Sequence, residues 1–536
     1  MSKKIKKKNN VKIKVENKGA NVAAYIYVLL MLGVFPFFYT NNYINILESK
    51  WGFFSITTLI AVVVAGISTL ILFCTRYEDV KKDSWKLWLK TFSITDWCII
   101  LLMMSVLISW LFCDYKTEAF TGSAGKMAGV YFYIILFLAY FLVSRYLKYD
   151  QWILLVYIIA NFIVFGLAIL NHFMIDPLGM YVNLMEDNYW MFITTMGNIN
   201  VLAGYFCVFV PVTMVLFCFC ETLLSHTIYG VFMVVSFMGL ISANGDAGII
   251  GIGVAFVFLF WFCFDSYARL KRFFLMATLF FAGAGIIGFL DDVNIKTVKE
   301  PLATLPSFIG KSTVSHLAII LFAVCTLVMF LLQKKEVVVK PLKMIRNIIF
   351  VLIGLIVLAG FSTFIYLSTA GKSIDLGQWD TYLRFSDLWG SSRGFTWTRV
   401  LTIYGEDYNV IQKLFGFGPD LLGVPLHERF NDQIFAKMGA YLVDAHNETL
   451  QVLSTLGIFG VVGYLGMQIT ACRRFAKNFQ KDPFLLAVAT GIVAYIAQGM
   501  MGSPQTFGTP ILFIGLAIGE SIMRGNRQNE DIISSD

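Results

Sequence analysis

Residues 347–369 read NIIFVLIGLIVLAGFSTFIYLST, a stretch of 23 residues without a charged side chain. A helix needs roughly 20 apolar residues to cross the hydrocarbon core of a bilayer, and by this measure the chain contains about 14 such runs. They lie near 21–40, 52–74, 97–113, 127–144, 152–174, 200–220, 224–243, 247–264, 273–290, 314–332, 347–369, 449–471, 484–500 and 507–523. The sequence therefore predicts an all-α polytopic membrane protein with about 14 transmembrane helices.

The composition of the chain points to the same class. Of the 536 residues, 58% are hydrophobic and only 14% are charged, whereas a soluble domain usually carries about 25% charged residues. A soluble fold has no interior large enough for this much apolar surface, so we exclude that class. The nine cysteines lie in or beside apolar runs without a CxxC pair, and we expect neither structural disulfides nor a zinc site.

The distribution of Lys and Arg predicts how the chain is oriented. Short loops rich in these residues stay on the cytoplasmic side of a membrane. If the N-terminus is inside, most of the predicted inner loops are rich in Lys and Arg, whereas residues 171–198 carry none. These inner loops are 75–96, 145–151, 221–223, 265–272, 333–346 and 472–483, with the tail from Arg524. We therefore expect a multi-pass protein of the cytoplasmic membrane with both termini in the cytoplasm.

The N-terminus begins MSKKIKKKNNVKIK, a dense basic block. Such a block can bind nucleic acid, but a membrane span follows it directly. We interpret it as an anchor beside anionic membrane lipid, and we expect no nucleic-acid partner.

The predicted chain organisation has five parts, of which one long loop stands out. Residues 370–447 are polar and aromatic and form by far the longest connection. A structureless loop of this length is unusual, so we expect it to fold on the outer membrane surface and to carry function. The five parts are a basic cytoplasmic tail (1–20), transmembrane helices 1–11 (21–369), the extracytoplasmic loop (370–447), transmembrane helices 12–14 (448–523) and a cytoplasmic tail (524–536).

Glycine patterns in the spans favour helix packing over chemistry. Gly283-Ala284-Gly285-Ile286-Ile287-Gly288 matches GxGxxG, but it lies inside an apolar span without a preceding strand. The glycines at 457, 460, 463 and 466 recur every three residues. Both patterns are typical of a closely packed helix face.

The long loop contains an ordered set of polar and glycine residues. Residues 391–423 read SSRGFTWTRVLTIYGEDYNVIQKLFGFGPDLLG. Arg393 and Trp397 are four residues apart, and Gly416-Phe417-Gly418 forms a Gly-x-Gly turn. Arg offers a planar fork that matches phosphate oxygens, so this segment suits an anionic ligand at the membrane surface.

A second segment follows at the entry to the next span. Residues 444–467 read DAHNETLQVLSTLGIFGVVGYLGM, in which His446-Asn447 opens a helix. Earlier, Gly197-Asn198-Ile199-Asn200 precedes another span. Taken in order, these features resemble the O-antigen ligase and polymerase superfamily of bacterial membrane proteins. The resemblance covers roughly residues 190–470.

The resemblance implies a membrane glycosyltransferase. That family transfers glycans from a polyprenyl diphosphate carrier to an acceptor hydroxyl on the outer face of the cytoplasmic membrane. The expected partners are thus a polyprenyl-diphosphate-linked glycan donor and a saccharide or lipid-linked acceptor. Departure of the diphosphate drives transfer, so no ATP site or cofactor is expected, and no metal is required if arginines stabilise the leaving group.

The resemblance also assigns roles to individual residues. Arg393 would bind the diphosphate, with Arg384 and Arg399 as supporting candidates. Alternatively, these arginines pair with acidic residues of the loop. Those acids are Asp380, Asp387 and Glu406.

His446 is the predicted catalytic base. A neutral histidine can take the proton of an attacking hydroxyl near pH 7. Alternatively, His446 is a polar residue at a helix start, where Asp444 or Asn447 is the cap. Trp397 either packs the loop or stacks on a sugar. The further substrate-binding residues by resemblance are Asn447, Asn198 and Asn200.

Two other functions remain open at this stage. A flippase or another transporter for lipid-linked oligosaccharides would also have about 14 spans. A non-catalytic relative is the third interpretation, because the family often has a Ser-Arg-Gly-Ala-like motif at an outer helix end. This chain has Ser242-Ala243-Asn244-Gly245 there, without the arginine.

Overall fold

The computed structural model describes residues 16–75, 91–294, 298–337, 340–502 and 508–533. The basic block at 1–15 and the lysines at 81–90 of the first predicted inner loop lie outside these residues. The described chain is almost entirely helical, with one short antiparallel pair, β1 (Phe192–Ile193) and β2 (Gly197–Asn198). The predicted all-α class is confirmed.

A helix forms at each of the apolar runs predicted from the sequence. Among the described residues, eleven helices are long and apolar enough to cross a membrane, and α7 and α21 are shorter apolar helices. The helices at the runs are α1 (Lys18–Gly33), α2 (Ile46–Thr75), α5 (Ile94–Phe112), α7 (Val130–Tyr146), α8 (Gln151–His172), α9 (Ile199–Phe219), α10 (Leu223–Ser242), α11 (Asp246–Cys263), α12 (Tyr267–Val293), α14 (Thr313–Lys334), α15 (Lys340–Ser368), α20 (Glu448–Asn478), α21 (Pro483–Gly499) and α22 (Thr509–Ile533). The chain is therefore a polytopic membrane protein.

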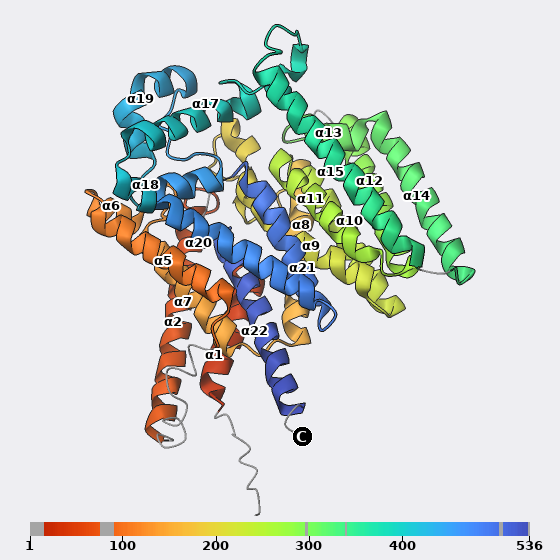
Figure 1. The fold of residues 1–536 in the computed structure, drawn as a ribbon, viewed down its shortest axis with the longest axis horizontal. Coiled ribbons are helices and arrows are strands. Elements are labelled where there is room, and N and C mark those ends of the chain that lie inside the picture. The colour runs from red at the N-terminus through yellow and green to blue at the C-terminus, as the bar shows by residue number, and fades with distance from the viewer. Residues whose placement is uncertain (1–15, 76–90, 295–297, 338–339, 503–507, 534–536) are drawn as a thin grey trace, which may run out of the picture.

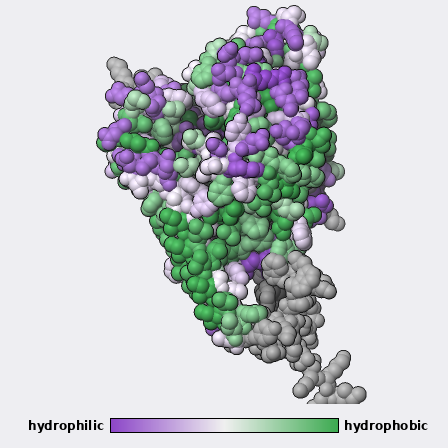
Figure 2. All heavy atoms as spheres, turned by 90° about the vertical axis from the view of Figure 1, so that its left-hand side faces the viewer, coloured by the Kyte–Doolittle hydropathy of each residue, from purple (hydrophilic) through white to green (hydrophobic). Residues whose placement is uncertain are grey.

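Burial separates central helices from helices that face the surroundings. In the most apolar stretch of α9, 94% of the residues are buried, whereas no residue is buried in the corresponding stretch of α15. Leu355, Ile356 and Val357 of α15 are exposed apolar side chains. Such a surface is stable in lipid but not in water. On the side of the molecule drawn in Figure 2, an apolar belt lies below a hydrophilic end.

Residues 369–447, between α15 and α20, fold into a series of short elements that we call the cap. Its elements are η3 (Gly377–Trp379), α16 (Asp380–Leu383), α17 (Trp389–Thr402), the π-helix η4 (Ile403–Asp407), α18 (Val410–Phe415) and α19 (Gly423–Met438). In Figure 1 the cap helices α17–α19 lie at the upper end of the molecule. The start of α1 and the end of α22 lie at the opposite, lower end.

Short elements between the spans complete the fold. Two of them, α6 and α13, lie at the same end of the molecule as the cap (Figure 1). The short elements are η1 (Phe35–Phe37), α6 (Lys116–Thr121), η2 (Glu186–Met191) and α13 (Thr304–Lys311).

The two glycine patterns of the sequence have different outcomes. Gly288 of α12 lies against the backbone of Gly310 in α13, so the GxGxxG segment packs helices as predicted. Gly463 likewise lies against the backbone of Leu102 in α5. Gly457, however, has a φ of +69° and breaks α20 instead of continuing its packed face. The prediction of a continuous glycine face was wrong at this residue.

Close backbone contacts join the cap to α20. A Cβ on Gly416 would lie 2.1 Å from the carbonyl carbon and oxygen of Thr455, and a Cβ on Gly457 would lie 2.3 Å from the carbonyl carbon of Leu414. The backbone N–H of Phe417 donates to Ser454 O at 3.0 Å. The turn after α18 and the break in α20 therefore fit together only as glycines, and this contact fixes the cap on the membrane helices.

We expect Gly416→Ala to destabilise the protein. Gly416 has a φ of +89°, so the substitution adds backbone strain of about 1–3 kcal/mol to the clash with Thr455. Thermal unfolding of the purified protein in detergent measures the effect as a lower midpoint. Gly405→Ala is the matched control, because a Cβ there meets nothing within 4 Å. An unchanged unfolding midpoint for Gly416→Ala would show that the close contact between the cap and α20 does not stabilise the fold.

Candidate functional site

His446 lies in the turn that leads from the cap into α20. Asn447 is the N-cap of this helix: its side-chain oxygen accepts a hydrogen bond from the Leu450 N–H at 3.0 Å. Its amide nitrogen donates to Met500 O at the end of α21, at 3.3 Å. Asn447 is 2% exposed. The structure thus uses Asn447, rather than Asp444, to start the helix and to hold α20 against α21.

The turn presents the His446 side chain outward. His446 has a φ of +46°, which is uncommon for a residue with a side chain. The Asp444 carboxylate supports this conformation, because its Oδ1 accepts the His446 backbone N–H at 2.7 Å. The same oxygen lies 3.1 Å from His446 Nδ1, and the imidazole is 46% exposed. Asp444 therefore orients the ring and favours the tautomer whose Nε2 is free to accept a proton.

Asp444 also pairs with a lysine from a distant loop. Lys126 Nζ lies 2.8 Å from Asp444 Oδ2, and both side chains are largely buried. The loop that carries Lys126 is fixed by Asp420, whose Oδ2 accepts from the N–H groups of Ser123 at 2.8 Å and of Ala128 at 3.1 Å. Lys126 is therefore held between two anchored positions and directed at the site.

Arg393 lies on α17 and is the unpaired arginine of the predicted set. Its guanidinium donates to Gly390 O at 2.8 Å and to Met501 O at 3.3 Å. No carboxylate forms an ion pair with it in the described part of the chain, and its Nε is buried without a partner. Two adjacent carbonyls at the end of α21 thus hold Arg393 and Asn447, the neighbour of His446.

The other two predicted arginines are occupied by cap contacts. Arg384 pairs with Asp380 at 2.5 Å, and Arg399 pairs with Asp387 at 2.7 Å. These are the alternative partners considered from the sequence, although Glu406 pairs instead with Arg429. Because their charge is balanced by carboxylates, Arg384 and Arg399 are less suited than Arg393 to bind an anion.

Trp397 connects α17 to the turn before His446. Its indole N–H donates to Ala445 O at 3.1 Å, and its ring packs edge-on against Trp389 with centroids 5.0 Å apart. Ala445 is also held by Gln451, whose side-chain oxygen accepts its N–H at 2.9 Å. Trp397 therefore packs the cap and positions the residue beside His446.

Asn198 and Asn200 lie at the start of α9, where Asn198 is the N-cap and accepts the Asn200 N–H at 2.8 Å. One turn further on, a Cβ on Gly204 would lie 3.5 Å from the side chain of Gln498 in α21. The start of α9 therefore lies at the same end of the bundle as the site. Among the described residues, no hydrogen bond or ion pair joins either asparagine to Arg393 or His446.

The segment Ser242–Gly245, which lacks the expected arginine, is hydrogen-bonded to the loop before α13. Asn244 accepts the Ala303 N–H at 2.6 Å and donates to Pro301 O at 3.1 Å. Asp246 follows at the start of α11, and its carboxylate lies near enough to Arg393 to interact with its charge. An acidic residue therefore acts on Arg393 from the start of α11.

The electrostatics of the site keep His446 neutral near pH 7. Burial lowers the pKa of His446, the Asp444 carboxylate opposes this, and the charges of Arg393 and Lys126 lower it further. Burial also lowers the pKa of Arg393. For Asp444, burial raises the pKa, but Lys126 and His446 outweigh this and keep it well below its ordinary value. The site thus combines a neutral imidazole, an ionised carboxylate and a nearby guanidinium.

Two residues of this arrangement were missed as functional residues from the sequence. Asp444 was considered only as a helix cap, and Lys126 lies at the end of a loop that was expected to be poor in cations. No spacing rule connects Lys126 to His446, because more than three hundred residues separate them. The two-residue spacing of Asp444 and His446 was the one available signal.

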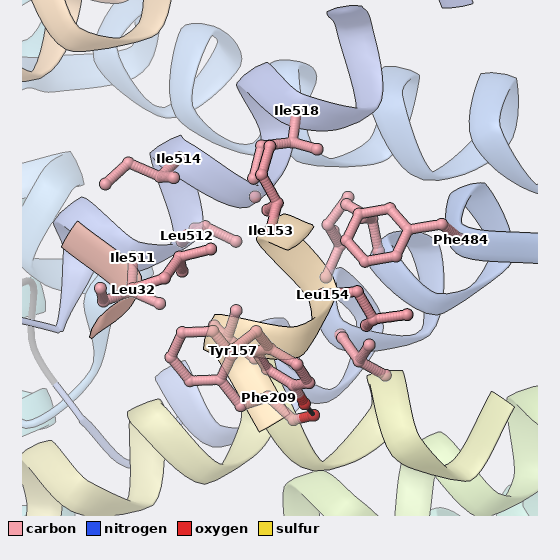
Figure 3. Close-up of a pocket in the computed structure, with 16 residues that line it drawn as sticks. Leu32, Ile153, Leu154, Tyr157, Phe209, Phe484, Ile511, Leu512, Ile514 and Ile518 are labelled. Carbon is pink, nitrogen blue, oxygen red and sulfur yellow. Dashed lines mark hydrogen bonds between the residues drawn. The ribbon is translucent and has the colours of Figure 1, made fainter. Parts of the chain in front are cut away.

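An apolar cavity lies in the bundle, apart from this site. It lies between α1, α8, α9, α21 and α22 and has a volume of about 40 Å³ (Figure 3). Leu154, Phe209, Phe484 and Ile518 point into it (Figure 3). Its lining suits hydrocarbon, and it includes none of the candidate site residues.

No protein-family model matches the chain, and no curated protein matches it. Within the described residues, no group of three or more His, Cys, Asp or Glu side chains could hold a metal ion.

Proposed function

We propose that this protein is a glycan ligase or polymerase of the cytoplasmic membrane. It would transfer a saccharide from a polyprenyl diphosphate carrier to an acceptor hydroxyl. One observation carries this proposal: an arginine without a carboxylate partner lies near a neutral, oriented histidine, where the polar cap meets the membrane helices. A lipid diphosphate places its charge at this boundary, so the cation and the base are where such a donor needs them.

The reaction uses these groups in one displacement. His446 Nε2 takes the proton of the acceptor hydroxyl, and the hydroxyl oxygen forms a bond to the anomeric carbon. The bond from that carbon to the diphosphate oxygen breaks, and its electron pair stays on the departing lipid diphosphate. Arg393 stabilises this negative charge. Asp444 stabilises the imidazolium that forms, and Lys126 keeps Asp444 ionised.

The proposed orientation places the cap outside the cell. Arg145, Arg474 and Arg524 form ion pairs at the ends of α7, α20 and α22 that lie away from the cap. The positive-inside rule assigns such an end to the cytoplasm. Both termini would then be cytoplasmic, and the site would face the compartment in which lipid-linked glycans are joined to acceptors.

Glycan analysis of cells that lack this protein tests the proposal. Loss of long surface chains indicates a polymerase, and accumulation of complete lipid-linked chains on the outer leaflet indicates a ligase. Accumulation on the inner leaflet indicates a flippase instead. Unchanged surface glycan and unchanged lipid-linked pools would exclude transfer as its function and would favour a non-catalytic relative.

We expect Lys126→Met to change the pH dependence of transfer. The base works only when neutral, so activity falls as the pH drops through the pKa of His446, which lies below its usual 6.5. The Lys126 charge helps to lower this pKa, so its removal raises the pKa and moves the acid limb to higher pH.

A pH–rate profile of the purified enzyme measures this shift. Lys413→Met is the control, since Lys413 donates to Gly405 O elsewhere in the cap. If the acid limb of the pH–rate profile does not move in Lys126→Met, the Lys126 charge does not affect the pKa of His446.

A further inference from the structure

A second concave surface lies on the cap, and none of the residues discussed as the site belongs to it. It has a volume of about 440 Å³ and lies between the end of η4, α18, the Gly416–Gly418 turn and α19. We call it the cap groove. It is lined by Asp407, Tyr408, Gln412, Phe417, Pro425, Glu428 and Arg429.

One part of the cap groove is apolar and aromatic. The rings of Tyr408 and Phe417 are stacked with centroids 5.9 Å apart and an interplanar angle of 22°. Tyr408 is buried, and its hydroxyl is hydrogen-bonded to Ser454 of α20 at 2.7 Å. The ring of Tyr115, from the segment before α6, lies 6.3 Å from that of Phe417. These contacts hold the aromatic surface rigid.

The other part of the cap groove carries charged and hydrogen-bonding groups. Arg429 donates to Asp407 Oδ1 at 2.6 Å, and Glu428 Oε1 accepts from the Tyr115 hydroxyl at 3.2 Å. In the described structure each carboxylate uses one oxygen in these contacts. The second oxygens can still bind hydroxyl groups, and so can the amide nitrogen of Gln412, whose Oε1 accepts the Asn409 N–H at 3.0 Å. Asp407 is 42% exposed and Arg429 35%, so a ligand can reach both.

This combination selects a class of ligand. A hydrocarbon chain would cover the second oxygens of Asp407 and Glu428 without offering them hydrogen bonds, and a phosphate group would be repelled by the two carboxylates. A saccharide has both an apolar C–H face, which packs on an aromatic ring, and hydroxyl groups, which donate to carboxylates. We propose that the cap groove binds an uncharged oligosaccharide segment of a glycan.

The cap groove and the candidate site share one helix. Ser454, which bonds Tyr408, lies fewer than three turns along α20 from His446. A glycan held in the cap groove is therefore attached to the same rigid element that starts beside the base. Its role as the binding site for the acceptor or growing chain rests on the proposed function, whereas saccharide binding itself does not.

Binding to immobilised glycans tests this inference. The full-length protein in detergent is applied to a slide that carries uncharged oligosaccharides of hexoses and N-acetylhexosamines. The wild type should be retained on at least one glycan, and Asp407→Asn should lower the apparent affinity for it about tenfold or more, because a charged acceptor of hydrogen bonds is lost. Phe417→Leu should also weaken binding, since it removes the aromatic face.

Glu406→Gln is the matched control. Glu406 and Asp407 are adjacent, and both pair with Arg429, at 2.5 Å and 2.6 Å, but only Asp407 lines the cap groove. Glu406→Gln should bind like the wild type, and thermal unfolding shows whether each variant is folded. No retention of the wild type, or equal binding by folded Asp407→Asn, would overturn the inference. Normal binding together with full transfer by His446→Ala would remove the proposed base and leave the saccharide site intact.

Discussion

Replacing His446 by Ala is expected to lower glycan transfer by about 10²–10⁴-fold, the usual contribution of a general base. The His446 side chain is half exposed and makes its one polar contact, among the described residues, with Asp444. Its loss should therefore change stability little. Transfer is measured with purified protein and a lipid-diphosphate-linked donor, and thermal unfolding of the same sample shows that the fold is retained.

His427→Ala is the control for this experiment. His427 lies in α19 of the same cap, but its ring stacks on Tyr441 at 3.7 Å and its Nε2 accepts the Leu442 N–H at 3.0 Å. These contacts are structural, so His427→Ala should lower the unfolding midpoint more than the rate per folded molecule. Full transfer by folded His446→Ala would eliminate the proposed base.

Asp444→Asn is expected to lower the rate of transfer, but by less than His446→Ala. The amide can no longer accept Nδ1–H as a carboxylate does, so the preferred tautomer and the stabilisation of the imidazolium are both weakened. Because Asp444 raises the pKa of His446, its neutralisation should also move the acid limb to lower pH. This direction is opposite to that expected for Lys126→Met, so one set of pH–rate profiles distinguishes the two partners.

Replacing Arg393 by Ala is expected to lower kcat/KM by roughly 10- to 100-fold, which corresponds to one or more charge-assisted hydrogen bonds of about 1.5–3 kcal/mol. The guanidinium is held by the carbonyl groups of Gly390 and Met501 and lacks an acidic partner among the described residues. Its charge is therefore available to a diphosphate. Arg393→Lys keeps the charge but loses the planar fork, and we expect it to recover only part of the activity.

The matched control for Arg393 is Arg399 in the same helix. Arg399 pairs with Asp387 and lies over the ring of Phe395, with 3.9 Å between guanidinium carbon and ring centroid. Arg399→Lys should leave kcat/KM near the wild-type value. If Arg399→Lys and Arg393→Lys lose activity equally, the unpaired state of Arg393 has no special role in donor binding.

The helical membrane fold was predictable because it depends on local composition. Each apolar run such as 347–369 contains enough hydrophobic residues to form a span wherever it packs. The break in α20 at Gly457 was not predictable, because it depends on the backbone of Leu414 approaching it from the cap. A regular glycine spacing cannot distinguish such a contact from an ordinary helix face.

For the candidate site, sequence reasoning identified residues but not their partners. Arg393 and His446 were selected by type and by resemblance, and the structure places them near each other. Which arginines are balanced by acids could only be given as alternatives, because ion pairs such as Arg399–Asp387 depend on the folded cap. Lys126 had no signal at all, since its contact with Asp444 joins two segments that lie far apart in the sequence.

The two carbonyl groups at the end of α21 have a consequence for biosynthesis. Arg393 and Asn447 donate to Met501 and Met500, which the ribosome adds after both of them and after most of the other helices. A nascent chain released before residue 501 would insert its earlier helices and fold parts of the cap, yet its candidate site would lack this support. Activity should therefore arise late in synthesis, and supplying the missing C-terminal fragment as a separate polypeptide should restore it.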